Sequence, residues 1–102
     1  MIKRKVEILA EISEYLRDSG NLSSWFAGLA VNPRQRLFVA HNVQEKSAGH
    51  WIYRECVNAV DAREVVDHLI KHLGTDGDYG TIDPNARYVY AYRKNPGTRE
   101  LA

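Results

Sequence analysis

The fold is decided by residues 25–42, which read WFAGLAVNPRQRLFVAHN. The first residues of this stretch are aromatic or branched and suit a pleated strand, and Gly28 leaves room there for another group to approach the backbone. Asn32 ends the strand and is suited to cap a helix. Pro33 fits the first helical position, where no amide donor is needed. The stretch therefore predicts a strand followed by a short helix.

The predicted short helix carries Arg34, Arg36 and His41. A guanidinium binds phosphate oxygens through paired, charge-assisted hydrogen bonds. A close-approach glycine, a guanidinium and an imidazole in one compact unit thus indicate a phosphate-handling site. The alternative is that Arg36 pairs with a carboxylate inside the fold.

Length and composition indicate one ordinary globular domain. The chain has 102 residues, of which 44% are hydrophobic and 26% charged. Its net charge of +1 gives no global attraction to nucleic acid, so any such contact must come from a local patch. Because Cys56 is the single cysteine and no apolar run reaches the roughly 18 residues of a membrane helix, we expect a cytoplasmic protein without a membrane segment.

Residues 2–17 predict an amphipathic helix, and Gly20 suits its left-handed closing position. The helix is expected to pack on its own sheet, with partner binding as the alternative. The apolar face is expected to consist of Ile2, Val6, Leu9 and Leu16, with Ile8 and Ile12 at its flank.

The remaining pattern predicts an α/β fold with a small three-stranded sheet flanked by about three helices. The single domain, residues 1–102, divides into an N-terminal helix, a core and a loose tail. Asn58 with Asp61 resembles a capping box, and Gly74 is suited to close the helix that follows. The expected segments are the helix region 1–20, the core 24–93 and the tail 94–102, and within the core the strands 24–31, 51–57 and 87–93, the helices 33–41 and 58–73, and a Gly/Asp loop over 75–85.

Several of these residues resemble the second half of the GIY-YIG nuclease module. The resemblance rests on Phe26-Ala27-Gly28, on Arg36 eight residues after the glycine, and on His41-Asn42. Ala62 and Leu69-Ile70 resemble the next helix of that family, so the resemblance spans about residues 25–71. It implies a truncated GIY-YIG-like fold.

The resemblance also implies metal-dependent cleavage of DNA, and the departures from the family pattern imply that this activity is lost. Nucleases of this family cut DNA with one divalent metal held by a helix glutamate, while tyrosines and an arginine position water and phosphate. In this chain no glycine-isoleucine-tyrosine strand precedes Trp25, Phe26 lacks a hydroxyl, and Val66 stands at the glutamate position. Valine offers no oxygen ligand to a hard cation, and the nearby Glu64 and Asp67 lie off the apolar stripe that contains Val66. The sequence therefore predicts a scaffold without metal-dependent catalysis.

The leading hypothesis is a nuclease-like scaffold, not an enzyme, that binds DNA or RNA without cofactor or metal. Arg36 and His41 are the sole candidates for a catalytic role. Trp25, Trp51 and Tyr53 could supply base stacking beside the arginines, and the other interpretation is solvated charges with core aromatics. The expected nucleic-acid contacts are Arg34, Arg36, His41 and Arg54.

Two alternatives of other classes stay open. One is an active endonuclease that uses Mg²⁺ through Glu64, Asp67 or another carboxylate. The other is a protein-interaction module or homodimer that uses exposed tyrosines of the last strand or the first helix. Two further groups resemble metal sites only weakly. The first is the histidine pair on the third predicted helix, for which solvated side chains are the favoured interpretation: His68 and His72. The second is the group of aspartates in the Gly/Asp loop, for which a tight turn is favoured: Asp76, Asp78 and Asp83.

Overall fold

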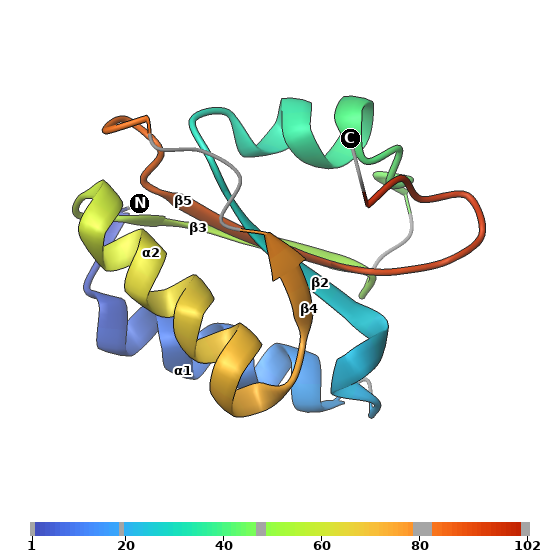
Figure 1. The fold of residues 1–102 in the computed structure, drawn as a ribbon, viewed down its shortest axis with the longest axis horizontal. Coiled ribbons are helices and arrows are strands. Elements are labelled where there is room, and N and C mark those ends of the chain that lie inside the picture. Colours follow the sequence, from blue (N-terminus) through green and yellow to red (C-terminus); the bar gives the residue numbers. More distant parts are fainter. Residues whose placement is uncertain (1, 19, 47–48, 79–82, 101–102) are drawn as a thin grey trace.

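The computed structural model describes residues 2–18, 20–46, 49–78 and 83–100 (Figure 1). Within these ranges the centre is a five-stranded mixed sheet in the order β1-β3-β5-β2-β4. The three central strands are antiparallel, and the two edge strands run parallel to their neighbours. The α/β class is confirmed, but the prediction of three strands is wrong, because it omits the two edge strands of the sheet. The strands are β1 (Ile2–Lys3), β2 (Trp25–Ala30), β3 (Trp51–Cys56), β4 (Asp76–Asp78) and β5 (Tyr88–Arg93).

Helices cover both faces of the sheet, with α1 and α2 side by side on one face and the short helix η2 on the other (Figure 1). In the described part of the chain, no helix combines the length and apolarity needed to cross a membrane. The helices are α1 (Lys5–Asp18), the 3₁₀ turn η1 (Leu22–Ser24), the π-helical η2 (Gln35–Ala40), and α2 (Ala59–His68) continued by the π-helical η3 (Leu69–Leu73).

The helix boundaries follow the predicted caps. The side chain of Asn32 accepts a hydrogen bond from the amide of Gln35 at 3.1 Å, and that of Asn58 accepts one from the amide of Asp61 at 2.8 Å. Gly74 closes η3 with φ 86°, a left-handed conformation that suits glycine. Local sequence therefore sets where these helices begin and end.

The N-terminal helix differs from its prediction in start and orientation. Ile2 pairs with Glu55 in a parallel strand, so α1 begins at Lys5. Val6, expected on the buried face, is 62% exposed. The buried positions are Ile8, Ile12, Ser13 and Leu16, because packing against β3 and α2, rather than the apolar pattern alone, decides which face of the helix turns inward.

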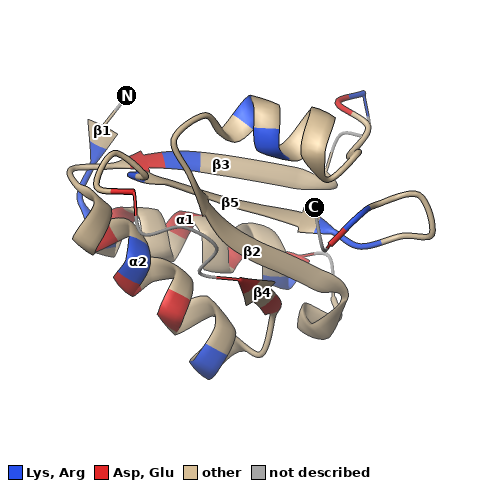
Figure 2. Ribbon diagram, turned by 45° about the horizontal axis from the view of Figure 1, so that its top comes forward, with Lys and Arg blue, Asp and Glu red and all other residues tan. Residues whose placement is uncertain are grey.

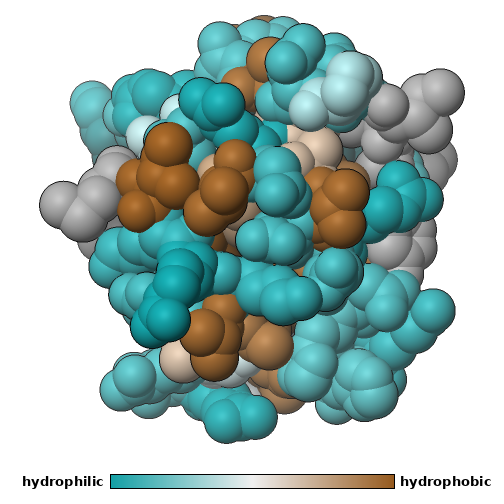
Figure 3. Space-filling model, turned by 90° about the vertical axis from the view of Figure 1, so that its left-hand side faces the viewer, coloured by the Kyte–Doolittle hydropathy of each residue, from teal (hydrophilic) through white to brown (hydrophobic). Residues whose placement is uncertain are grey.

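The end of the molecule that holds β1 and the start of α2 exposes apolar side chains in separate patches within a hydrophilic surface (Figure 3). Single exposed apolar residues are normal on a soluble domain. The exposed large apolar residues include Ile2, Val6, Val57 and Val60.

Alternation along β2 divides the core into two layers. Trp25, Ala27 and Leu29 face α1 and α2, whereas Phe26 and Ala30 belong to the layer beneath η2. The second layer also contains two tyrosines of the last strand. These residues, Tyr90 and Tyr92, are 2% and 0% exposed because they lie in the layer that η2 covers, and β5 is paired on both sides. The last strand is therefore no open edge, and two of its three tyrosines are buried, which leaves only the partly exposed Tyr88 for the dimer surface proposed from the sequence.

The predicted Gly/Asp loop contains the edge strand β4, which pairs with β2. Gly77 is required there, because a Cβ would lie 2.6 Å from the carbonyl oxygen of Ala27 and 2.7 Å from Cδ1 of Ile70. The rest of that loop prediction falls partly on residues 79–82, which lie outside the described ranges.

Candidate functional site

Strand pairing builds one row of side chains across the layer beneath η2. Gly28 of β2 lies opposite Asp78 of β4 on one side and Tyr90 of β5 on the other, and Tyr90 lies opposite Tyr53 of β3. Directly opposed residues project from the same face of a sheet. A Cβ on Gly28 would lie 2.4 Å from the hydroxyl oxygen of Tyr90. The predicted close approach at Gly28 is confirmed, and the approaching group is a phenol.

The wide turn of η2 brings Arg36 and His41 together. The amide of His41 donates to the carbonyl of Arg36 at 2.8 Å, a hydrogen bond spanning five residues that is typical of a π-helix. This turn places Nη2 of Arg36 3.3 Å from Nε2 of His41. The sequence predicted both residues on one helix but not the π-helical geometry that makes them meet.

The imidazole of His41 is buried and has one tautomer favoured by its partners. Its Nδ1 lies 2.6 Å from the carbonyl oxygen of Arg99, and because a carbonyl only accepts, we assign the proton to Nδ1. Nε2 then accepts from the hydroxyl of Tyr90, 2.7 Å away. His41 is 1% exposed, so it is no surface ligand in this structure.

Burial keeps His41 and Tyr90 uncharged near neutral pH, and the charge of Arg36 assists this at His41 but opposes it at Tyr90. Burial lowers the pKa of His41 and the positive charge of Arg36 lowers it further, while the carbonyl of Arg99 and the negative charges of Glu100 and Asp78 act against this. Burial raises the pKa of Tyr90, and the hydrogen bond and charge of Arg36 oppose that rise. The resulting set is a neutral imidazole, a protonated phenol and a partly exposed guanidinium.

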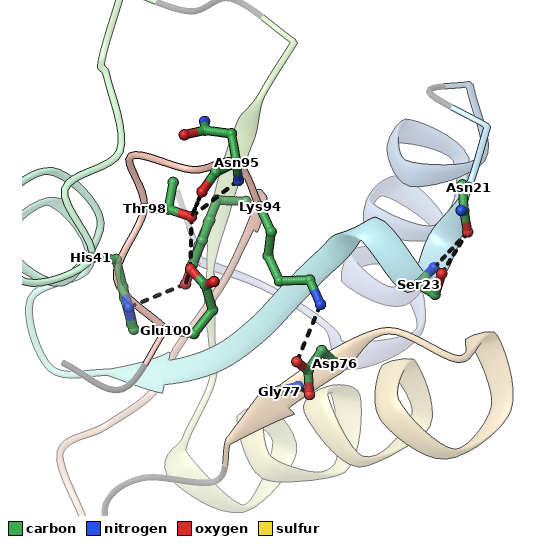
Figure 4. Close-up of polar contacts among 10 residues, drawn as sticks. Asn21, Ser23, His41, Asp76, Gly77, Lys94, Asn95, Thr98 and Glu100 are labelled. Carbon is green, nitrogen blue, oxygen red and sulfur yellow. Dashed lines mark hydrogen bonds and ion pairs between the residues drawn. The ribbon is translucent and has the colours of Figure 1, made fainter.

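The C-terminal tail completes this site. The hydroxyl of Tyr92 lies 3.2 Å from Nδ1 of His41 and donates to Oε2 of Glu100 at 3.0 Å. Thr98 donates to the same carboxylate oxygen at 2.7 Å, and the amide of Arg99 donates to the carbonyl of His41 at 2.8 Å. Figure 4 shows Thr98 and Glu100 of the tail beside His41.

These contacts hold Thr98, Arg99 and Glu100 against the sheet, within the tail 94–102 that we expected to be loose. Residues 101–102 lie outside the described part. Burial and the Glu100 carboxylate both raise the pKa of Tyr92, which therefore keeps its proton. We call Arg36, His41, Tyr90, Tyr92 and Glu100 the Arg36 cluster.

Of the other predicted contact residues, Arg34 lies on the same face as the cluster and Arg54 does not. Arg34 forms an ion pair with Glu45, and its guanidinium carbon lies 5.1 Å above the ring centre of Phe38. Arg54 donates to Glu11 of α1 at 2.7 Å, which turns it toward the α1 side. Figure 2 shows basic positions on η2, β3 and α2 rather than on one face. The expected patch of four residues is therefore wrong for Arg54.

The α2 residues that the nuclease resemblance singled out lie on the opposite side of the sheet from Arg36. Val66 is fully buried in the layer beneath α1 and α2. Glu64 forms an ion pair with Lys5 of α1, and Asp67 forms one with Lys71 at 3.1 Å. None of these α2 side chains belongs to the layer that holds Arg36.

The other candidates for metal and thiol chemistry lie on the side of the sheet that α1 and α2 cover. Among the described residues, no three His, Cys, Asp or Glu side chains are grouped so that they could hold a metal ion. His68 and His72 do lie together, with ring centres 4.7 Å apart, but on α2 and η3. Cys56 is fully buried, and burial raises its pKa to about 11, so its thiol is a poor nucleophile.

Sequence reasoning missed Tyr90, Tyr92 and Glu100 as site residues. The alternating pattern YVYAY placed the tyrosines on one face of a strand, but nothing in it identified β2 as the neighbouring strand. No family model, curated protein or solved structure matches this chain.

Proposed function

We propose that this chain binds the phosphate backbone of a nucleic acid at the Arg36 cluster and does not cleave it by a metal-dependent reaction. The proposal includes a GIY-YIG-like scaffold and a reducing, cytoplasmic location, in line with the single buried thiol of Cys56. The observation that carries it is Arg36, a partly exposed residue whose guanidinium lies beside the ring of His41, which in turn contacts the phenol of Tyr90.

The geometry supports phosphate because the charge is oriented before any ligand arrives. Arg36 has a permanent positive charge and a planar fork of five donors, and its contact with His41 fixes one edge of that fork. His41 and Tyr90 are uncharged, so the negative charges that act at the site are those of Glu100 and Asp78, and the permanent charge of Arg36 must attract the anion against them. Fixing donors in advance reduces the ordering cost of binding.

The test compares Arg36→Gln with Arg63→Gln, an exposed arginine of α2 on the opposite face. Binding of labelled 20-nucleotide DNA and RNA is measured by fluorescence anisotropy between 50 and 200 mM salt. We expect Arg36→Gln to weaken binding and to reduce the salt dependence by about one phosphate contact, while Arg63→Gln binds like the wild type. Unchanged binding by Arg36→Gln would remove this site from the proposal.

A second candidate, metal-dependent cleavage, is favoured by the carboxylate of Glu100. It lies one hydrogen bond from Tyr92, and carboxylate oxygens are the ligands that Mg²⁺ prefers. Supercoiled plasmid incubated with Mg²⁺ or Mn²⁺ distinguishes the two functions. We expect no nicking. Reproducible nicking that Arg36→Gln and Glu100→Gln both abolish would establish the nuclease instead.

A further inference from the structure

Beside the Arg36 cluster, η2 and the sheet together carry a continuous strip of partly exposed rings, of which the first is on η2 and the others on β3 and β5: Phe38, Trp51, Tyr53 and Tyr88. The ring centres of Phe38 and Trp51 are 4.9 Å apart, those of Trp51 and Tyr53 are 5.9 Å apart and nearly parallel, and those of Tyr53 and Tyr88 are 6.3 Å apart. We call these four residues the aromatic strip. By contrast, Trp25, the third aromatic expected to stack on bases, is fully buried beneath α1 and α2.

The aromatic strip adjoins the proposed phosphate site. Tyr53 lies directly opposite Tyr90 in the antiparallel pair of β3 and β5, so both side chains project from the same face. Neighbouring strands lie about 4.8 Å apart. The partly exposed ring of Tyr53 is therefore one strand away from Tyr90, whose hydroxyl contacts both His41 and Arg36. The sugar of one nucleotide can span this separation.

Basic side chains flank the strip at both ends. Arg34 lies over Phe38, and its hydrogen bond to Tyr53 contributes to raising the pKa of Arg34. At the other end Arg87 donates to Glu55 at 2.8 Å. The side chains of Arg34 and Arg87 are 52% and 48% exposed. Both partners of the Arg34–Glu45 pair are about half exposed, and exposed ion pairs contribute little stability, so a phosphate group can replace the Glu45 carboxylate at low cost. Glu55 is only 15% exposed, so its pair with Arg87 is harder to replace.

We infer that the nucleic acid bound by this chain is single-stranded, with an unpaired base stacked on Tyr53 while the phosphate of the same nucleotide lies on Arg36. The inference rests on the proposed function and specifies its ligand. In a duplex the bases are paired and stacked inside the helix, so they cannot reach a ring while their phosphate is bound. Rings beside a basic groove are the common means of holding single strands.

The experiment measures the affinity of the full chain for a labelled 20-nucleotide single strand and for the same sequence as a duplex. It uses the wild type, Tyr53→Leu, Tyr53→Phe and Arg36→Gln. Tyr53→Phe keeps the ring but loses the hydroxyl that contacts Arg34, so it separates stacking from hydrogen bonding. Tryptophan fluorescence gives an independent signal, because Trp51 is partly exposed whereas Trp25 is fully buried.

We expect the single strand to bind at least tenfold more tightly than the duplex. Tyr53→Leu should lose about tenfold in single-strand affinity, since stacking contributes about 1–3 kcal/mol per base, and Tyr53→Phe should bind like the wild type. The single strand should also quench fluorescence in the wild type but not in Trp51→Phe.

Two results would overturn the inference: duplex binding that equals or exceeds single-strand binding, or full affinity in Tyr53→Leu. If Arg36→Gln still weakens binding in either case, the proposed phosphate site is supported and only the stacking on Tyr53 is refuted. If neither nucleic acid binds, both proposals fall. Should circular dichroism show that Tyr53→Leu is unfolded, the absence of quenching in the wild type would refute the stacking.

Discussion

Replacing Gly28 by alanine tests whether the close approach of Tyr90 organises the site. The added Cβ would lie 2.4 Å from the hydroxyl oxygen of Tyr90 and 2.6 Å from its Cζ. Tyr90 cannot swing into solvent to relieve this overlap, because its ring is 2% exposed and its hydroxyl is held by His41. The ring must shift, and the hydrogen bond to Nε2 of His41 must lengthen or break.

The expected loss of stability follows from these contacts. Overpacking a well-filled core costs about 1–3 kcal/mol, and losing one buried hydrogen bond costs about 1 kcal/mol more. Alanine offsets about 0.5–1 kcal/mol of this loss, because glycine loses more conformational entropy than alanine when the strand forms. Gly28→Ala should therefore destabilise the protein by about 1–3.5 kcal/mol and lower its Tm by at least about 4 °C.

A double-mutant cycle with Tyr90→Ala, measured by urea denaturation, isolates the contact. Once the tyrosine ring is gone, a methyl group on Gly28 meets no obstacle. In that background Gly28→Ala should be neutral or stabilise by up to about 1 kcal/mol. An equal loss of stability in both backgrounds would refute the reasoning, as would a wild-type background in which Gly28→Ala raises the Tm.

Three further outcomes are expected. Because the pKa of His41 is lowered in the folded protein, its contribution to stability is complete above the unfolded value of about 6.5 and falls as the pH drops below it. Urea denaturation at pH 7.5 and 5.5 should show this loss, and His41→Gln should reduce it. Cys56, buried with a pKa of about 11, should react with a disulfide reagent at pH 8 only as fast as the protein unfolds. Glu100→Gln should cost about 1 kcal/mol in stability, since Tyr92 loses a charged acceptor, whereas Glu45→Gln on an exposed ion pair should stay within about 0.5 kcal/mol.

The sequence predicted those parts of the fold that depend on neighbouring residues. Asn32 and Asn58 cap helices through side chains that accept amides three residues away. Gly74 ends a helix through its own backbone conformation. Each of these signals acts within one turn of the chain, so the order of the main helices and strands could be inferred without knowing the tertiary structure.

The edge strands could not be predicted in this way. Ile2–Lys3 and Asp76–Asp78 are too short to show a pattern, and each becomes a strand only by pairing with a distant segment. The same reason explains the exposed Val6: its helix is oriented by contacts with β3 and α2 that the apolar pattern of the helix does not contain.

The candidate site was half predicted. Gly28, Arg36 and His41 come from one stretch of sequence, and the structure brings all three to one layer. Their partners Tyr90 and Glu100 lie about fifty or more residues further along the chain. A site built across strands β2 and β5 and the tail needs the sheet order, which no local pattern encodes.

The sheet order also changes what the missing hydroxyl of Phe26 implies. Phe26 lies directly opposite Tyr92, and Tyr92 carries a hydroxyl into the same layer. The absence of a tyrosine at position 26 therefore does not remove phenols from the site, and Val66, beneath the other face, neither supplies nor blocks a ligand there.

What separates binding from cleavage is then the carboxylate of Glu100. This group already accepts hydrogen bonds from Tyr92 and Thr98, and a hard divalent cation would have to displace them and find further oxygen ligands. As long as Glu100 stays with those hydroxyls, the Arg36 cluster offers an anion a positive charge and donors, but offers no metal a coordination shell. The proposed binding without cutting therefore predicts that Glu100→Gln keeps its affinity for nucleic acid.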